Sequence, residues 1–274
     1  MGKILRLYPL PAEEIPLAGA YLGHDLRRYA ESMGKSFVYT NFIVSLDGRI
    51  AIPHPSGRGL MVPSAIANER DWRLFQELAV QADVILSSGR YLRELAAGRS
   101  PEIVQVDDPL FTDLRAWRER RGLPAHPDMA ILSAGLDFSI PQALIAGGQR
   151  VLVFTGQDAD PVQVKAIEAQ GGQVFVAGER GVDGALLVQR LAGLGYRTIY
   201  SSAGPQIMNL LVAGGVLDRL YLTLAGRLLG GPHFATLLEG PLLDPAGEMQ
   251  VSHIYLDPRA LQGTGQLFLS YDRL

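Results

Sequence analysis

Short apolar runs alternate with amphipathic segments through the middle of this chain, and that alternation restricts the fold more than any other feature. The segment after Ser64 shows it clearly, because Trp72, Phe75 and Leu78 recur at helical spacing behind a residue type suited to cap a helix. Strands that alternate with helices predict βαβ units and a mainly parallel sheet. The expected strands cover residues 37–46, 84–89, 129–135, 150–156, 173–178, 198–204 and 217–231, with helices near 161–170 and 185–195 and from Pro205.

The two ends of the chain follow different patterns. Residues 1–35 carry Pro9, Pro11 and Pro16, which disfavour regular structure, before a short helical segment. The last two extended runs, VSHIYLD and GQLFLSYDRL, have no helix between them, so they predict antiparallel strands at one edge of the sheet. We therefore expect an N-terminal arm over 1–35 and one domain over 36–274.

The composition argues against several classes of function. The chain has 274 residues, of which 47% are hydrophobic and 19% charged, and its formal net charge is −3. Such a chain does not favour binding to nucleic acid, and it has no run of about 18 apolar residues to span a membrane. Cysteine is absent, which excludes disulfides and thiolate catalysis, and the five scattered histidines do not favour a metal site. A cytoplasmic protein without a signal peptide is the default expectation.

Residues 92–128 interrupt the alternation. This stretch is polar, rich in arginine and broken by prolines, so it predicts a solvated excursion that contains one helix. Arg115, Arg118, Arg120 and Arg121 fall within that helix. Clustered arginines usually form a solvated helix face.

Small, hydroxylated or glycine residues follow most of the expected strands. Open parallel sheets bind ligands outside the carboxyl ends of their strands, where such residues let backbone amides approach a phosphate or a flat ring. The helix that begins at Pro205 would direct its N-terminal amides toward the same region. The candidate positions are Asp47-Gly48-Arg49, Ser87 to Arg90, Ser133, Thr155-Gly156, Ser201 to Pro205 and Gly230-Gly231.

Three segments, in matching order, carry a resemblance to a known family. They are FIVSLDGRIA, ADVILSSGRYL and SSAGPQIMNLLVAGGVLDRLYLTLAGRLLGG. Over roughly residues 37–272 the chain resembles the reductase domain of riboflavin biosynthesis, the RibD C-terminal domain, which has a dihydrofolate-reductase-like fold. The resemblance implies a three-layer α/β fold with a mostly parallel central sheet and antiparallel C-terminal edge strands.

The resemblance also implies an activity. It is that of an NADPH-dependent, typically homodimeric reductase of a pyrimidine or pterin-like heterocycle, most like 5-amino-6-(5-phosphoribosylamino)uracil reductase. Asp47 and Arg49 would contact and orient this small-molecule substrate. The residues implied to line the cofactor are Ser45, Ser87, Gly89, Gly204 and Pro205.

Further cofactor contacts are expected from charge and position. Arg58 and Arg90 carry guanidinium groups suited to a 2′-phosphate, and Ser133 and Thr155 end two of the expected strands. Ser202 precedes the last predicted helix, which we expect it to cap, and it stands where the family has a glutamate. That departure keeps two alternatives open: a dihydrofolate-type reductase on the same fold, and a non-catalytic dimeric nucleotide-binding protein.

Overall fold

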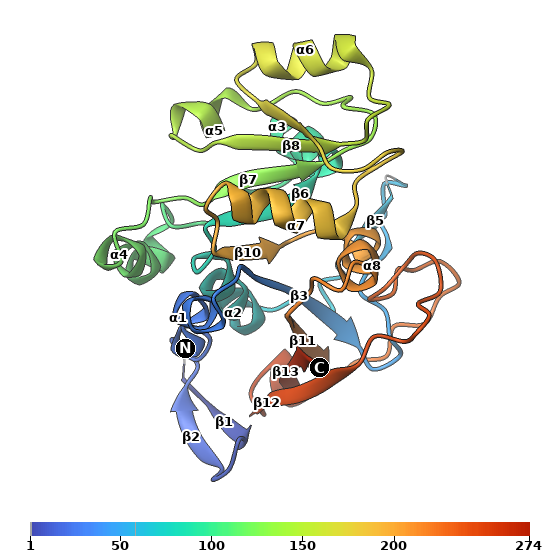
Figure 1. Cartoon of the computed structure of the whole chain (residues 1–274). Coiled ribbons are helices and arrows are strands. Elements are labelled where there is room, and N and C mark those ends of the chain that lie inside the picture. The colour runs from blue at the N-terminus through green and yellow to red at the C-terminus, as the bar shows by residue number, and fades with distance from the viewer. Residues whose placement is uncertain (1, 58) are drawn as a thin grey trace.

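One mixed sheet runs through the computed structural model, which describes residues 2–57 and 59–274 (Figure 1). Within these residues the sheet has 11 strands in the order β2-β1-β12-β13-β11-β3-β10-β6-β7-β8-β9, and β4 and β5 form a separate pair. The strands are β1 (Lys3–Tyr8), β2 (Glu13–Pro16), β3 (Phe37–Ser45), β4 (Ile52–Pro53), β5 (Leu60–Met61), β6 (Val84–Ser88), β7 (Asp128–Leu132), β8 (Val151–Thr155), β9 (Gln173–Val176), β10 (Thr198–Ser201), β11 (Arg219–Ala225), β12 (Met249–Asp257) and β13 (Gln266–Arg273). The α-helices are α1 (Leu26–Met33), α2 (Glu69–Ala79), α3 (Gly89–Ala96), α4 (Thr112–Arg120), α5 (Gln142–Ala146), α6 (Pro161–Ala169), α7 (Gly184–Gly193) and α8 (Pro205–Ala213).

The strands from β11 to β9 in this order are parallel, as the alternation of strands and helices predicts. β8 is buried along its whole length and β3 over its first half, which fits strands covered on both faces. β11 pairs with β13, and β13 with β12, in antiparallel orientation. The predicted mostly parallel sheet with antiparallel C-terminal strands is therefore confirmed.

Helices cover both faces of the parallel strands, which gives three layers (Figure 1). On one face, Leu78 of α2 packs in the same core as Tyr39 of β3. On the other face, Leu187 of α7 and Leu211 of α8 pack with Val38. Tyr39 and Val38 point to opposite faces because side chains alternate along a strand. None of the helices in the described ranges is long and apolar enough to cross a membrane.

The N-terminal arm is part of the sheet. β1 pairs with β2 and with β12, so this hairpin extends the sheet beyond its C-terminal strands, which are not at the edge. Pro9 and Pro11 lie in the turn between β1 and β2, and Pro16 ends the edge strand, positions where a proline removes little hydrogen bonding. The prediction of irregular structure was therefore wrong.

Two predicted helix caps were also wrong. α2 is capped by Asn68 instead of Ser64. α8 has Gly204 as its cap residue, directly before the first turn, and Ser202 lies too early to serve. α2 begins later than the apolar spacing suggests, whereas α8 begins at Pro205 as predicted and β10 ends early, at Ser201.

The arginine cluster of α4 is only partly solvated. Arg118 is 1% exposed, and its guanidinium donates to the carbonyl oxygens of Val80 and Ala82 at 2.7 and 2.8 Å. Burial lowers the pKa of Arg118 to about 10. This arginine satisfies carbonyl groups at the end of α2, so it has a structural role that the composition of the cluster concealed.

Candidate active site

The carboxyl ends of the parallel strands meet at one edge of the sheet. The chain runs outward through β6, β7, β8 and β9 and then returns, placing β10 between β3 and β6. Such a reversal of strand order leaves a crevice where open α/β sheets bind ligands. The turn after β10 begins against strand β6, since the amide of Ser202 donates to the carbonyl oxygen of Leu86 at 3.1 Å.

Asp47 lies in the turn directly after β3 and accepts hydrogen bonds from four groups. The Ser45 hydroxyl donates to Oδ1 at 2.5 Å, and the Arg49 guanidinium donates to Oδ2 at 2.6 Å. The backbone amides of Leu229 and Gly230 donate to Oδ2 at 3.1 and 2.8 Å. The structure thus brings the predicted residues Ser45, Asp47 and Arg49 together and adds a distant loop to them.

That loop reaches the β3 turn because β11 is shorter than predicted. The strand ends at Ala225, not at Gly231. Gly230 and Gly231 have φ values of 67° and 93°, in the left-handed region that glycine adopts readily. The Arg49 guanidinium donates to the Gly231 carbonyl oxygen at 3.0 Å and lies 4.2 Å from the centre of the Phe234 ring. Arg49 therefore holds the loop against β3 at two places, Gly231 and Phe234.

The hydrogen bonds to Asp47 also determine its protonation state. The hydrogen bonds from Ser45 and from the amide of Gly230 hold the pKa of Asp47 well below its usual range. Asp47 therefore stays ionised at neutral and mildly acidic pH. A carboxylate occupied in this way holds its neighbours in place and is poorly suited to exchange a proton.

The predicted positions on β6, β7 and β8 form the second part of the edge. Ser87 is 2% exposed, and Gly89 begins α3. A Cβ on Gly89 would lie 2.8 Å from the Phe138 ring and 3.3 Å from the Ser133 hydroxyl, so glycine alone permits this close approach. Thr155 ends β8, and its buried hydroxyl finds no hydrogen-bond partner in the described part of the chain. An unpaired buried hydroxyl is costly unless a ligand pairs with it.

The two arginines expected near a 2′-phosphate have different outcomes. Arg90, at the start of α3, is exposed and donates to the carbonyl oxygen of Leu60 at 3.3 Å. Arg58 lies outside the described residues. The contact of Arg90 with Leu60 places a cation against the loop that carries β4 and β5.

The turn after β10 supplies a helix N-terminus at the same edge. α8 begins at Pro205, and no side chain in the described part of the chain caps it. A Cβ on Gly204 would meet nothing within 4 Å, so the space before the helix is open. The amides and partial positive charge of such a terminus favour a phosphate group.

Sequence reasoning missed a second carboxylate near β3. Asp71, in the first turn of α2, accepts a hydrogen bond from the Thr223 hydroxyl of β11 at 2.6 Å. Burial raises the pKa of Asp71 to about 6, although the bond from Thr223 opposes the shift. The sequence concealed this residue because acidic side chains are common in first helical turns, where the helix dipole favours them.

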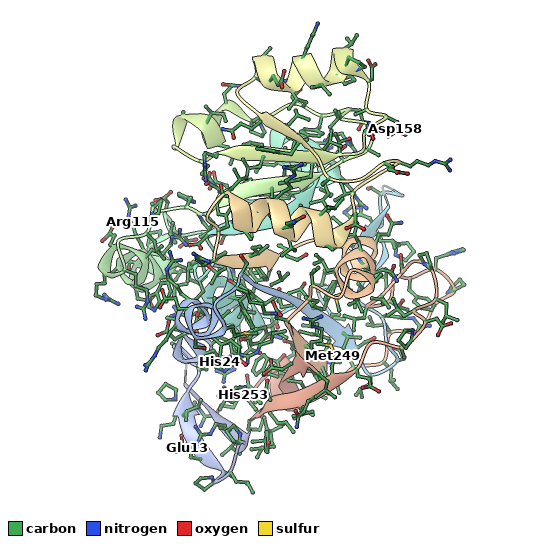
Figure 2. The ribbon with its side chains drawn as sticks, in the orientation of Figure 1. Glu13, His24, Arg115, Asp158, Met249 and His253 are labelled. Carbon is green, nitrogen blue, oxygen red and sulfur yellow. The ribbon has the colours of Figure 1, made fainter. Side chains whose placement is uncertain are left out.

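Two histidines meet at a separate place, between the N-terminal arm and β12 (Figure 2). The rings of His24 and His253 stack with their centres 4.3 Å apart. The two nitrogens of His24 share hydrogen bonds with the hydroxyls of Tyr221 and Tyr255, at 2.7 and 2.8 Å. This cluster fastens the arm to the sheet. The part of the chain that the structure describes holds no group of three or more acidic or histidine side chains able to bind a metal.

Comparison with known proteins shows which family the chain resembles. The model of the RibD C-terminal domain matches residues 36–259. A 2,5-diamino-6-ribosylamino-4(3H)-pyrimidinone 5′-phosphate reductase of Methanothermobacter thermautotrophicus is 25% identical over 210 residues, which are 77% of this chain and 87% of that protein.

Solved structures share the fold. A pyrimidine reductase-like protein of Corynebacterium diphtheriae has a TM-score of 0.68 at 18% identity, with 91% of this chain and 98% of that one covered. The riboflavin biosynthesis reductase of Saccharomyces cerevisiae has a TM-score of 0.55 at 16% identity, with 92% and 99% covered. The predicted fold class is therefore confirmed. Because the family model matches most of its length, the chain belongs to the RibD C-terminal domain family.

Proposed function

We propose that this chain is an NADPH-dependent reductase that converts a ribosylaminopyrimidine phosphate to its ribityl form. The observation that carries the proposal is the Asp47–Arg49 ion pair, held at the end of β3 beside the reversal of strand order in a chain of this family. The activity named for the archaeal relative supports a substrate of this class.

The residues at the strand ends fit a dinucleotide cofactor. The N-terminus of α8, which has no side-chain cap, and the open space at Gly204 suit a phosphate. The unpaired hydroxyl of Thr155 can pair with a polar group of the cofactor. Arg90 is an exposed cation for a 2′-phosphate. NADPH, when bound, supplies the hydride, and the protein supplies binding and orientation.

We assign Asp47 and Arg49 positioning roles. Asp47 holds the amides of Leu229 and Gly230, so the loop after β11 stays fixed against the turn that ends β3. Arg49 adds a hydrogen bond to that loop and a ring contact with Phe234. Because this loop is already fixed, it can orient the substrate against the cofactor, and no loop residues need to become ordered during the reaction.

A fluorescence titration of the full chain, with NADPH and separately with NADH, tests the cofactor first. We expect NADPH to bind more tightly, since Arg90 offers a partner to the additional phosphate. Adding ribosylaminopyrimidine phosphates should then oxidise NADPH, measured as loss of nicotinamide absorbance. Failure of both cofactors to bind would contradict the proposal. Oxidation with dihydrofolate alone would favour the dihydrofolate-type alternative.

We also propose that the enzyme is a homodimer of the cytoplasm. The family resemblance supports the dimer, and Leu242 and Leu274, which are 95% and 74% exposed, offer apolar surface beside a groove of about 630 Å³. Light scattering should give twice the 29.7 kDa of the chain. A monomer at micromolar concentration would contradict the dimer and leave the reductase proposal unaffected.

A further inference from the structure

Residues 17–25 of the N-terminal arm (the covering segment) lie over part of the sheet. They pack in the same core as α2, and the ring of Tyr21 lies against that of Tyr221 of β11, with the ring centres 4.8 Å apart. Glu77 of α2 holds the segment from the other side, because it accepts from the backbone amides of Gly19 and Tyr21 at 2.6 and 3.0 Å. The covering segment therefore fills the space between α2 and β11.

His24, in the covering segment, is held by hydrogen bonds on both ring nitrogens. Nδ1 pairs with the hydroxyl of Tyr221 at 2.7 Å, and Nε2 pairs with that of Tyr255 at 2.8 Å. The Tyr221 oxygen also accepts from the guanidinium of Arg219 at 3.4 Å, so its own proton can point at Nδ1 of His24. Nε2 then carries the single proton of the neutral ring and donates it to Tyr255. The hydrogen bonds of the cluster thus fit a neutral histidine.

A second proton on His24 would enter a crowded and positively charged place. It would sit on Nδ1 and turn the proton of the Tyr221 hydroxyl away. The ring of His253 stacks on that of His24, with the ring centres 4.3 Å apart (Figure 2). Burial first, and then the charges of His253 and Arg219, hold the pKa of His24 well below its usual range. The closed cluster therefore resists protonation.

The groups around the two histidines do not compensate a positive charge. The charged and titratable groups that face the pair or the covering segment are Arg6 of β1, Glu77 of α2, Arg219 and Tyr221 of β11, Tyr255 of β12 and Asp272 of β13. Asp272 already forms an ion pair with Arg219. Burial first, and then Arg219, lowers the pKa of His253 to about 4, although Asp272 opposes the shift. The tyrosine hydroxyls have pKa values raised by burial and stay neutral.

We propose that His24 and His253 form an acid-sensitive latch: while neutral they hold the covering segment on the sheet, and their protonation releases it. In the released state each ring regains contact with water and is removed from the charge of the other. The released state therefore binds more protons than the closed state. Closing is fully favoured above about pH 6.5 and weakens as the pH falls from there toward about 4. The latch goes beyond the proposed function and does not depend on it.

Release would uncover a part of the sheet next to the candidate active site. Tyr221, which lies under the covering segment, is two residues from Thr223 on β11, so the two side chains point to the same face. Thr223 is the residue whose hydroxyl binds Asp71. The latch therefore controls the access of water to this side of the sheet.

A single cysteine can measure the opening, because the chain contains no other. Ala20→Cys places a thiol in the covering segment at a position that is 8% exposed. Its reaction with 4,4′-dithiodipyridine, an aromatic disulfide that reacts with thiols at acidic pH, is followed in the full chain and divided by the rate of a small thiol at the same pH. Since transient opening is enough for reaction, we expect this normalised rate to rise about 100-fold from about pH 7.5 to about pH 5.5, a factor of about ten for each histidine. Circular dichroism should show the fold intact at both pH values.

Two histidine variants in the Ala20→Cys background assign the pH dependence. His253→Gln leaves the hydrogen bonds of His24 in place, so the thiol should stay protected near pH 7.5, and the rise should fall to about tenfold. His24→Gln should react faster near pH 7.5 and show the same smaller rise. His126→Gln is the matched control, since His126 also bonds to a neighbour, Asp107 at 3.0 Å, but in the excursion before β7, and it should keep the full rise.

Three results would overturn the latch. The first is a normalised rate that does not change with pH while the fold stays intact. The second is a full rise that persists in both His24→Gln and His253→Gln, or a loss in His126→Gln as large as in His253→Gln. The third is a loss of circular dichroism in step with the loss of thiol protection, because the whole chain and not the covering segment would then be opening.

Discussion

Asp47 and Asp71 lie beside the same face of β3, yet their surroundings differ in charge and in hydrogen bonding. Asp47 has an arginine, a hydroxyl and two amides as donors, and its pKa is held well below the usual range. Among the residues that the structure describes, a single hydroxyl donates to Asp71, and burial raises its pKa to about 6. The difference teaches that one carboxylate is stabilised by the donors around it and holds the loop in place, whereas the other is buried at a cost that a single hydrogen bond offsets only in part.

The largest effect is expected at Asp47. An asparagine there loses the ion pair with Arg49 and turns an amide group toward N–H donors, so the loop at Leu229 should move. We expect kcat/KM for NADPH oxidation to fall roughly 100-fold, with NADPH affinity nearly unchanged, because small misplacements of an oriented site have effects of this size. Steady-state kinetics and the fluorescence titration measure the two quantities.

A matched control distinguishes the effect of the position of Asp47 from the effect of losing any carboxylate that is paired with an arginine. Asp107→Asn also removes a carboxylate paired with an arginine, Arg115 at 2.7 Å, but in the excursion before β7. It should leave turnover unchanged. Normal turnover in Asp47→Asn would show that Asp47 has no role in positioning the substrate, and the difference between Asp47 and Asp71 would then have no functional meaning.

Asp71→Asn should instead stabilise the protein, and only at higher pH. The folded-state pKa of Asp71, about 6, lies above the ordinary value of an aspartate side chain, 3.8. Folding therefore favours the protonated form, and stability is lost as pH rises between these two values. The shift corresponds to at most about 3 kcal/mol of unfolding free energy, present near pH 8 and nearly absent near pH 4. Urea denaturation of wild type and variant at both pH values measures it; equal stability at both would show that Asp71 is not desolvated.

The pH dependence of turnover should report Asp71 and not Asp47. If the substrate ring pairs with the ionised carboxylate, kcat/KM rises with pH and levels off above about 6, with a fall of about tenfold for each unit below. Asp47 stays ionised across this range and adds no step. Asp71→Asn should abolish the step. A step that persists in this variant belongs to another group, either in the protein or in the substrate.

Local contacts of the site were within reach of the sequence. Ser45, Asp47 and Arg49 lie on one short turn after a strand whose apolar residues identify it, so their proximity follows from spacing alone. The same holds for Gly204 before α8. The sheet was predictable for a similar reason, since its parallel strands are short continuous apolar runs.

The distant contacts were not predictable, for physical reasons. Leu229 meets Asp47 across 182 positions through an irregular loop, which has no periodicity to identify it. The strands of the arm were concealed because their prolines, Pro9 and Pro11, occupy the turn of a hairpin. Asp71 was concealed because its place in a first helical turn has an ordinary explanation. Pairing with Thr223 depends on how α2 crosses the sheet, and that is set by packing.

The smallest effect tests whether the hydroxyl of Thr155 is left without a partner so that a ligand can pair with it. Thr155→Val replaces a buried, partnerless hydroxyl by a methyl group of similar size, so it should raise stability by about 1 kcal/mol in the absence of ligand. It should also reduce the rise in melting temperature that NADPH produces, because a cofactor contact is lost. Thr198→Val is the matched control, since the hydroxyl of Thr198 is buried but accepts from the amide of Asp83 at 3.0 Å at the opposite edge. That variant should lose stability and keep the full response to NADPH. If Thr155→Val also keeps the full response, the hydroxyl of Thr155 has no role in cofactor binding.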